Sequence, residues 1–98
     1  MAIVMNMRWK GVTPEQFDTV RKLVNYEGDS PTGGIVHVVS FDADGVRITD
    51  VWNSAEEFQA FVETRLNPGV AKVGLLGQPE VEIAPLHLLF TPAFVAKS

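Results

Sequence analysis

Two strand-like segments of this chain carry apolar side chains at neighbouring positions, so they present apolar residues to both faces of a sheet. The first segment is Ile35-Val36-His37-Val38-Val39-Ser40-Phe41, and the second runs from Val81 to Phe90. An antiparallel sheet with one face in water alternates apolar and polar residues instead. A sheet built from these segments therefore needs a cover on each face.

The whole chain predicts four strands and two helices. β-Branched and apolar residues predict strands over 3–9, 35–41, 46–52 and 81–90. A Thr13-x-x-Gln16 capping box begins the first helix, whose apolar pattern ends at Gly28. A second box, formed by Ser54 and Glu57, begins the other helix.

The order strand, helix, strand, strand, helix, strand predicts an α+β fold of the ferredoxin-like βαββαβ kind, with both helices on one face of an antiparallel four-stranded sheet. Because 98 residues suit one core, we expect a single domain over residues 1–98. We expect Asn67-Pro68 to break or restart the second helix, since proline disfavours a helical residue before it and lacks an amide proton. Pro85 in the last strand indicates an edge position, a bulge or an unpaired amide.

Two helices can cover only one face of this sheet. Leaving the other face open would expose an apolar patch larger than the few hundred Å² that a soluble monomer tolerates. A second copy of the chain that buries roughly 800 Å² per subunit would cover it. We therefore expect a homodimer.

The charge and composition exclude several classes of partner. Twelve acidic and eight basic residues give a net charge of -4, which argues against nucleic acid and anionic membrane surfaces as partners. The chain has no cysteine, and its apolar runs are far shorter than the roughly 20 residues of a membrane span. The first eight residues lack the pattern of a signal sequence, so we expect a cytoplasmic protein.

The segments that join these elements resemble the dimeric α/β barrel superfamily, and within it the antibiotic-biosynthesis monooxygenase group. The matching stretches are Gly11-Val12-Thr13-Pro14-Glu15-Gln16-Phe17, Val36-His37-Val38, Asp44-Gly45-Val46-Arg47-Ile48-Thr49-Asp50-Val51-Trp52-Asn53-Ser54-Ala55-Glu56-Glu57-Phe58, Pro79-Glu80-Val81-Glu82 and Pro85-Leu86-His87. The resemblance implies that two sheets meet face to face as a dimeric barrel. It also implies that the last strand and the tail 92–95 reach toward the partner. The superfamily includes oxygenases, isomerases, cyclases and haem-degrading proteins, so it leaves the reaction open.

Polar residues on the first strand are candidates for ligand binding. Alternation places Asn6 and Arg8 on one face and the bulky apolar residues on the other, which predicts that both polar side chains face the barrel interior. An inward arginine can hold an anion, and an inward asparagine can donate to a developing oxyanion. Alternatively, Arg8 lies at the rim, with its charge in water or on an acid such as Asp50.

His37 is a candidate general base because an imidazole titrates near neutral pH. A two- or four-residue hairpin loop pairs His37 with Asp50, whereas a three-residue loop with Gly45 as a bulge sends Asp50 to the other face. The sequence leaves both registers open. A histidine with a purely structural hydrogen bond is the alternative interpretation.

Two further residues could serve a ligand. His87 offers a second imidazole or a polar contact to the partner, and Trp52 offers either a flat stacking surface or core packing. The two histidines lack metal-ligand spacing, so we predict no metal site. The sequence also has no phosphate-binding loop or dinucleotide fingerprint, and we expect no bound cofactor.

Three functional hypotheses follow. The first is a monooxygenase-like protein that acts on an aromatic or enolisable small molecule in the barrel cavity. In it, His37 or His87 takes a substrate proton. Asn6 and Arg8 hold the resulting anion while Trp52 lines the pocket. The second is a non-catalytic dimeric module that binds a small apolar ligand or serves in assembly. The third, haem degradation, uses in similar proteins a histidine in or just after the second helix, and residues 58–77 contain none.

Overall fold

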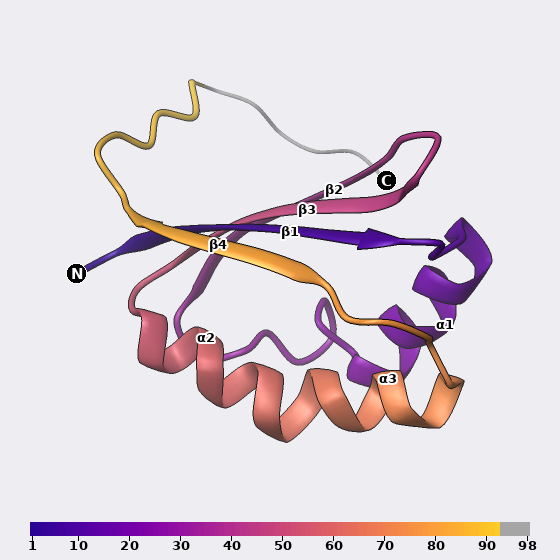
Figure 1. The fold of residues 1–98 in the computed structure, drawn as a ribbon. Helices are drawn as coiled ribbons and strands as arrows, with labels where there is room; N and C mark the ends of the chain where they lie inside the picture. The colour runs from indigo at the N-terminus through magenta and orange to yellow at the C-terminus, as the bar shows by residue number, and fades with distance from the viewer. Residues whose placement is uncertain (93–98) are drawn as a thin grey trace.

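Four antiparallel strands form one sheet in the structure, a computed structural model that describes residues 1–92 (Figure 1). In chain order the elements are β1 (Ile3–Lys10), α1 (Pro14–Val24), β2 (Gly34–Phe41), β3 (Gly45–Trp52), α2 (Ala55–Phe61), the π-helical turn η1 (Val62–Leu66), α3 (Asn67–Val73) and β4 (Glu80–Pro85). The strands lie in the order β2-β3-β1-β4. The predicted ferredoxin-like architecture is confirmed. In the described part of the chain, none of the helices combines the length and apolarity that crossing a bilayer requires.

All helices lie on one side of the sheet, where the core is buried (Figure 1). The alternating residues of β1 that face the helices are all buried, namely Ile3, Met5, Met7 and Trp9. Trp52 is completely buried among them, and Phe58 of α2 packs against it. The prediction that the bulky apolar residues of the first strand face the helices is therefore confirmed.

The predicted capping box is complete at Thr13, whereas at the second helix the Ser54 hydroxyl accepts from the Glu57 amide at 3.1 Å but the Glu57 carboxylate accepts from that hydroxyl and not from the Ser54 amide. The Thr13 hydroxyl accepts from the Gln16 amide at 3.2 Å, and the Gln16 side chain accepts from the Thr13 amide at 3.0 Å. The first helix, however, ends at Val24 rather than at Gly28. Asn25 adopts a left-handed conformation with φ 56° and donates its amide to the Arg21 carbonyl, which closes the helix early.

The second helical segment passes through Pro68 without a break and restarts as an α-helix at Asn67, so the predicted restart at Asn67-Pro68 is what the structure shows. Backbone angles stay helical at Phe61, Val62 and Asn67, where one element passes into the next. The turn before the proline is π-helical instead. Proline cannot donate to the carbonyl one α-helical turn earlier, and a wider turn accommodates its ring.

The last strand is shorter than predicted, because it ends at Pro85 instead of Phe90. Pro85 lies at the end of an edge strand, where its missing amide proton costs little. The amide of Leu86 donates to the Ala2 carbonyl at 2.9 Å, and the chain then leaves the sheet on the side opposite the helices (Figure 1). Leu88 and Phe90 of this segment are 77% and 75% exposed. The tail 93–95 lies outside the described residues.

The open face of the sheet, opposite the helices, changes from apolar at one end to charged at the other. Cross-strand pairing aligns three rows of side chains on this face. The apolar row consists of Val36, Val51, Val4 and Ala84, and the mixed row consists of Val38, Thr49, Asn6 and Glu82. The polar row consists of Ser40, Arg47, Arg8 and Glu80. The expectation of a sheet apolar on both faces is therefore wrong for half of this face. The apolar residues 86–90, which suggested it, lie beyond the strand.

Four residues, 42–45, separate Phe41 and Val46, the last pair between β2 and β3, and this spacing decides the register that the sequence left open. The Asp42 carboxylate accepts from the amides of Asp44 and Gly45 at 2.8 and 3.1 Å, which fixes the turn. From Phe41 and Val46 the pairing continues in one register along both strands. His37 therefore lies opposite Asp50.

Candidate functional site

A buried carboxylate on β3 joins two ring side chains on the helix side of the sheet. The Nδ1 atom of His37 lies 2.7 Å from Oδ1 of Asp50. The indole Nε1 of Trp52 donates to the other oxygen, Oδ2, at 3.1 Å. The Asp50 side chain is 5% exposed and that of His37 is 26% exposed. Both carboxylate oxygens thus have a donor in an otherwise apolar core.

The hydrogen bond to Asp50 selects one protonation pattern for the neutral His37 ring. An ionised carboxylate only accepts, so Nδ1 must carry the proton that is shared with Oδ1. The second nitrogen, Nε2, then holds a free lone pair. Within residues 1–92 the structure gives Nε2 no hydrogen-bond partner. The geometry therefore provides an imidazole that is ready to accept a proton.

The His37 ring borders an apolar cavity of about 50 Å³ between the sheet and the helices. Its lining is mostly apolar and comprises Met5, Met7, Phe17, Val20, Arg21, Val24, Tyr26, His37, Ile48, Asp50, Phe58, Phe61 and Leu66. Typical ligand pockets hold roughly 300 Å³ or more. A ring-sized ligand therefore requires that a lining side chain moves aside.

Tyr26, in the turn after α1, covers the imidazole. Its ring stacks on His37 with centroids 4.3 Å apart, and it meets Phe61 edge to face at 5.9 Å. Gly34 makes room for this tyrosine, since a Cβ there would lie 3.1 Å from the phenol oxygen. Burial first, and the charge of Asp50 second, raise the pKa of Tyr26 to about 12. The phenol therefore stays neutral beside the imidazole at physiological pH.

The single tyrosine of the chain allows this effect to be measured. We expect tyrosinate absorbance of the folded protein to appear with a midpoint near pH 12, against roughly pH 10 in denaturant. Because the unfolded chain loses the phenol proton first, unfolding becomes easier as pH rises from about 10 to 12. Tyr26→Phe should remove that part of the pH dependence. A folded-state midpoint at the denatured value would contradict the buried stack.

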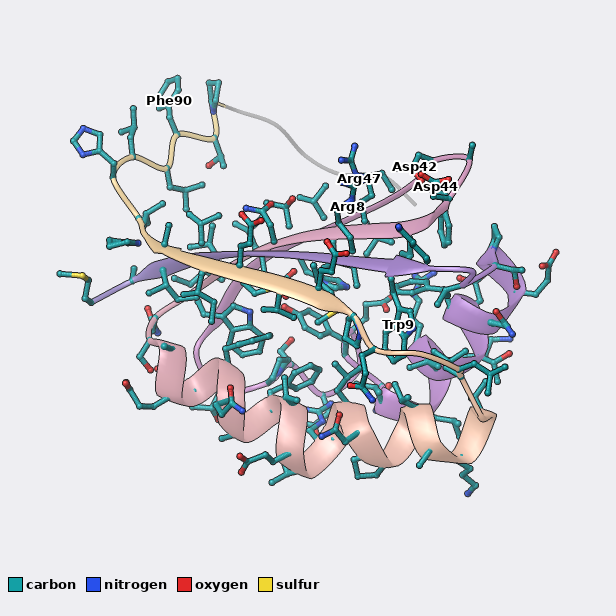
Figure 2. The ribbon with its side chains drawn as sticks, viewed as in Figure 1. Arg8, Trp9, Asp42, Asp44, Arg47 and Phe90 are labelled. Carbon is teal, nitrogen blue, oxygen red and sulfur yellow. The ribbon has the colours of Figure 1, made fainter. Side chains whose placement is uncertain are left out.

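Asn6 and Arg8 do not join this site, because alternation places them on the open face. They border a separate, polar hollow of about 470 Å³ there. Arg8 and Arg47 share the Asp42 carboxylate at 3.7 and 3.4 Å, so Arg8 pairs with Asp42 and not with Asp50. Figure 2 shows both arginines beside Asp42, with Trp9 on the opposite side toward the helices.

Two other candidates also lie apart from the His37 ring. His87 is exposed on the segment after β4, at the opposite edge of the sheet from β2. Trp52 has no exposed surface on which a ligand can stack, because Phe58 and Phe61 cover its ring at 5.5 and 5.3 Å. Within the part of the chain that the structure describes, no three side chains of His, Asp or Glu cluster as metal ligands would.

Sequence reasoning missed Tyr26 and the cavity beneath it. The only signal was an isolated aromatic residue directly after the apolar pattern of the first helix. Its role depends on the loop that folds it back over β2, and no local pattern reveals that fold.

The architecture matches several solved structures across nearly their whole length. SnoaB, a cofactor-independent oxygenase from Streptomyces nogalater, has a TM-score of 0.64 and 13% identity over 90% of this chain and 94% of that chain. A Deinococcus radiodurans protein, provisionally assigned as an antibiotic biosynthesis monooxygenase, has a TM-score of 0.60 and 14% identity over 93% and 97%. The chain has the fold of the antibiotic-biosynthesis monooxygenase group.

A dimeric ferredoxin-like protein of unknown function from Thermobifida fusca shares this fold, with a TM-score of 0.62 and 15% identity over 88% of this chain and 92% of that chain. No protein-family model matches the chain, and no curated protein does either. The likeness is therefore one of fold, and the chemistry must be argued from the side chains.

Proposed function

We propose that this protein is a cofactor-independent monooxygenase of small aromatic or enolisable molecules, with His37 as its base. The observation that carries the proposal is the His37–Asp50 hydrogen bond at the border of an apolar cavity. A carboxylate that fixes the imidazole tautomer is the arrangement that general-base catalysis needs. The shared fold with a cofactor-independent oxygenase supports the same class of reaction.

The chemistry needs only the substrate and dioxygen. Nε2 of His37 takes a proton from an activated CH₂ group, which leaves a delocalised carbanion in the apolar cavity. Dioxygen adds to that carbon, and the hydroperoxide formed after reprotonation loses water to leave a ketone. One oxygen atom enters the product and the other leaves as water, so no external reductant is required. Asp50 stabilises the imidazolium in between.

The proposed assembly is a homodimer of single-domain chains in which the open faces of two sheets meet. Val38 is 53% exposed beside the apolar row, and this surface needs a cover. The same face carries Arg8 and Arg47 as well as Glu80 and Glu82. Two copies related by a two-fold axis can therefore pair unlike charges across the interface.

His37→Gln tests the base. With a panel of enolisable aromatic ketones and hydroxyaromatics, we expect oxygen uptake by the natural protein and a fall in kcat/KM of about 100-fold or more in the variant. Circular dichroism checks that the variant is folded. ¹⁸O₂ labelling should place one labelled atom in the product.

His87→Gln discriminates between the two histidines, because His87 lies at the other edge of the sheet. Full activity in a folded His37→Gln protein would contradict the assignment of His37 as the base. Loss of activity in His87→Gln would contradict it as well. If compounds of the panel bind to the protein, as measured by thermal shift, but no oxygen is consumed, the result would favour the alternative function. That alternative is a non-catalytic module for small apolar ligands. The small cavity volume makes this a concrete alternative.

A further inference from the structure

The only polar group of the Trp52 side chain forms its hydrogen bond with Asp50. Its indole Nε1 donates to Oδ2 at 3.1 Å, although the residue is completely buried and borders neither the solvent nor the cavity. Tryptophan in a core commonly packs with its N–H bonded to a backbone carbonyl or water. Trp9 follows that pattern, because its Nε1 donates to the Leu76 carbonyl at 2.9 Å. The contrast singles out the bond of Trp52 to a charged side chain.

This bond constrains the carboxylate as a whole. A carboxylate that is bonded at Oδ1 alone can turn about its Cβ–Cγ bond and present either oxygen at a range of angles. A second donor at Oδ2 fixes the plane of the group, so Oδ1 stays at 2.7 Å from His37. Removal of the indole donor would also leave a buried charged oxygen unsatisfied, which the carboxylate can relieve only by turning.

The surrounding packing holds the indole in the direction that this bond requires. Phe58 and Phe61 both pack against the ring, with centroids 5.5 and 5.3 Å away, and Trp52 pairs with Ile3 on β1. Trp52 and Asp50 lie two positions apart on β3, so their side chains share the helix side of the sheet. The rigid strand thus sets the distance between the indole and the carboxylate.

We propose that Trp52 is a positioning residue for His37 and acts on it through Asp50. The indole orients the carboxylate, the carboxylate keeps the proton on Nδ1, and Nε2 stays free as the base. The inference rests on the proposed function for its catalytic meaning. The effect of Trp52 on the imidazole, however, can be measured in the protein without any substrate.

The test is ¹⁵N NMR of the histidine side chains in the full-length protein, at a pH where both imidazoles are neutral. We expect the natural protein to show a protonated Nδ1 and an unprotonated Nε2 for His37. In Trp52→Phe, which removes the donor, the two nitrogen shifts should move toward each other as tautomers begin to exchange. The exposed His87 provides an internal reference that should not change.

Phe58→Leu is the matched control, because Phe58 is 3% exposed and packs on the same indole. It disturbs the packing of Trp52 but keeps the N–H donor, so the His37 tautomer should remain fixed. If Trp52→Phe does not fold, a benzothienyl isostere introduced at position 52 replaces the N–H by sulfur and preserves the shape. An unchanged His37 tautomer in the isostere or in Trp52→Phe overturns the proposal, as does an equal change in Phe58→Leu.

On a substrate that the protein oxidises, loss of the indole donor should lower kcat about 10- to 100-fold, with KM nearly unchanged. A tautomer change without any oxygen uptake by the natural protein would refute the proposed function alone. Oxygen uptake that depends on His37, together with a tautomer insensitive to Trp52, would refute the positioning role alone.

Discussion

Val38→Glu is expected to convert the proposed dimer into monomers. Val38 lies at the centre of β2 on the open face, and Glu82 lies in the same row. In the proposed dimer each copy would bury a new carboxylate, and an unpaired buried charge costs about 3 kcal/mol or more. Two such sites in a symmetric interface should raise the dissociation constant by at least about 100-fold. Sedimentation velocity at micromolar concentration measures the change.

Leu76→Glu is the control for this experiment. Leu76 is also apolar and is 87% exposed, but it follows α3 and lies outside the open face. Its substitution should leave the proposed dimer intact. A natural protein that sediments as a folded monomer, or a Val38→Glu protein that still pairs as tightly as the natural one, would contradict the proposed interface. In the first case the charged half of the open face would simply face water.

Gly45→Ala is expected to cost about 2–5 kcal/mol of folding stability. Gly45 begins β3 with φ +153°, and a Cβ there would lie 2.3 Å from the backbone oxygen of Trp9. The neighbouring backbone cannot yield easily, because Gly11 donates its amide to the Asp44 carbonyl at 2.8 Å. Urea unfolding at one fixed protein concentration measures the loss, which is large for a domain of this size.

Gly11→Ala separates steric clash from backbone strain. Gly11 also has a positive φ, +82°, but no atom lies within 4 Å of the Cβ position. Its substitution should cost about 1 kcal/mol, from the left-handed conformation alone. Similar losses in both variants would show that the contact with β1 does not constrain the hairpin. Because this hairpin sets the register of β2 on β3, Gly45→Ala should also disturb the His37–Asp50 bond.

Local sequence signals predicted most of the fold. The two capping residues, Thr13 and Ser54, begin helices as expected, because their side-chain oxygens satisfy amides only a few residues away. Alternation along the first strand assigned its two faces correctly, since side-chain direction follows from the backbone. The restart at Asn67-Pro68 and the edge position of Pro85 were also predicted, whereas the length of the last strand was not, because the point where pairing ends depends on the neighbours of each residue.

The candidate site was predictable only in part. His37 and Asp50 were recognisable as chemical groups, but they lie 13 positions apart and share a face in one hairpin register only. Asn6 and Arg8 belong to the opposite face once that register is known. Tyr26 reaches the imidazole through a loop whose path no pattern reveals.

The amino-acid sequence by itself determined the order of strands and helices and the helix-facing side of β1, because capping and alternation act over a few residues. Only the tertiary structure decided that His37 meets Asp50, that Trp52 holds the other oxygen, and that the open face is half polar. The reason is that side chains on a strand alternate with a period of two. A slip of one residue in the β2–β3 hairpin would have turned the His37 imidazole away from the Asp50 carboxylate.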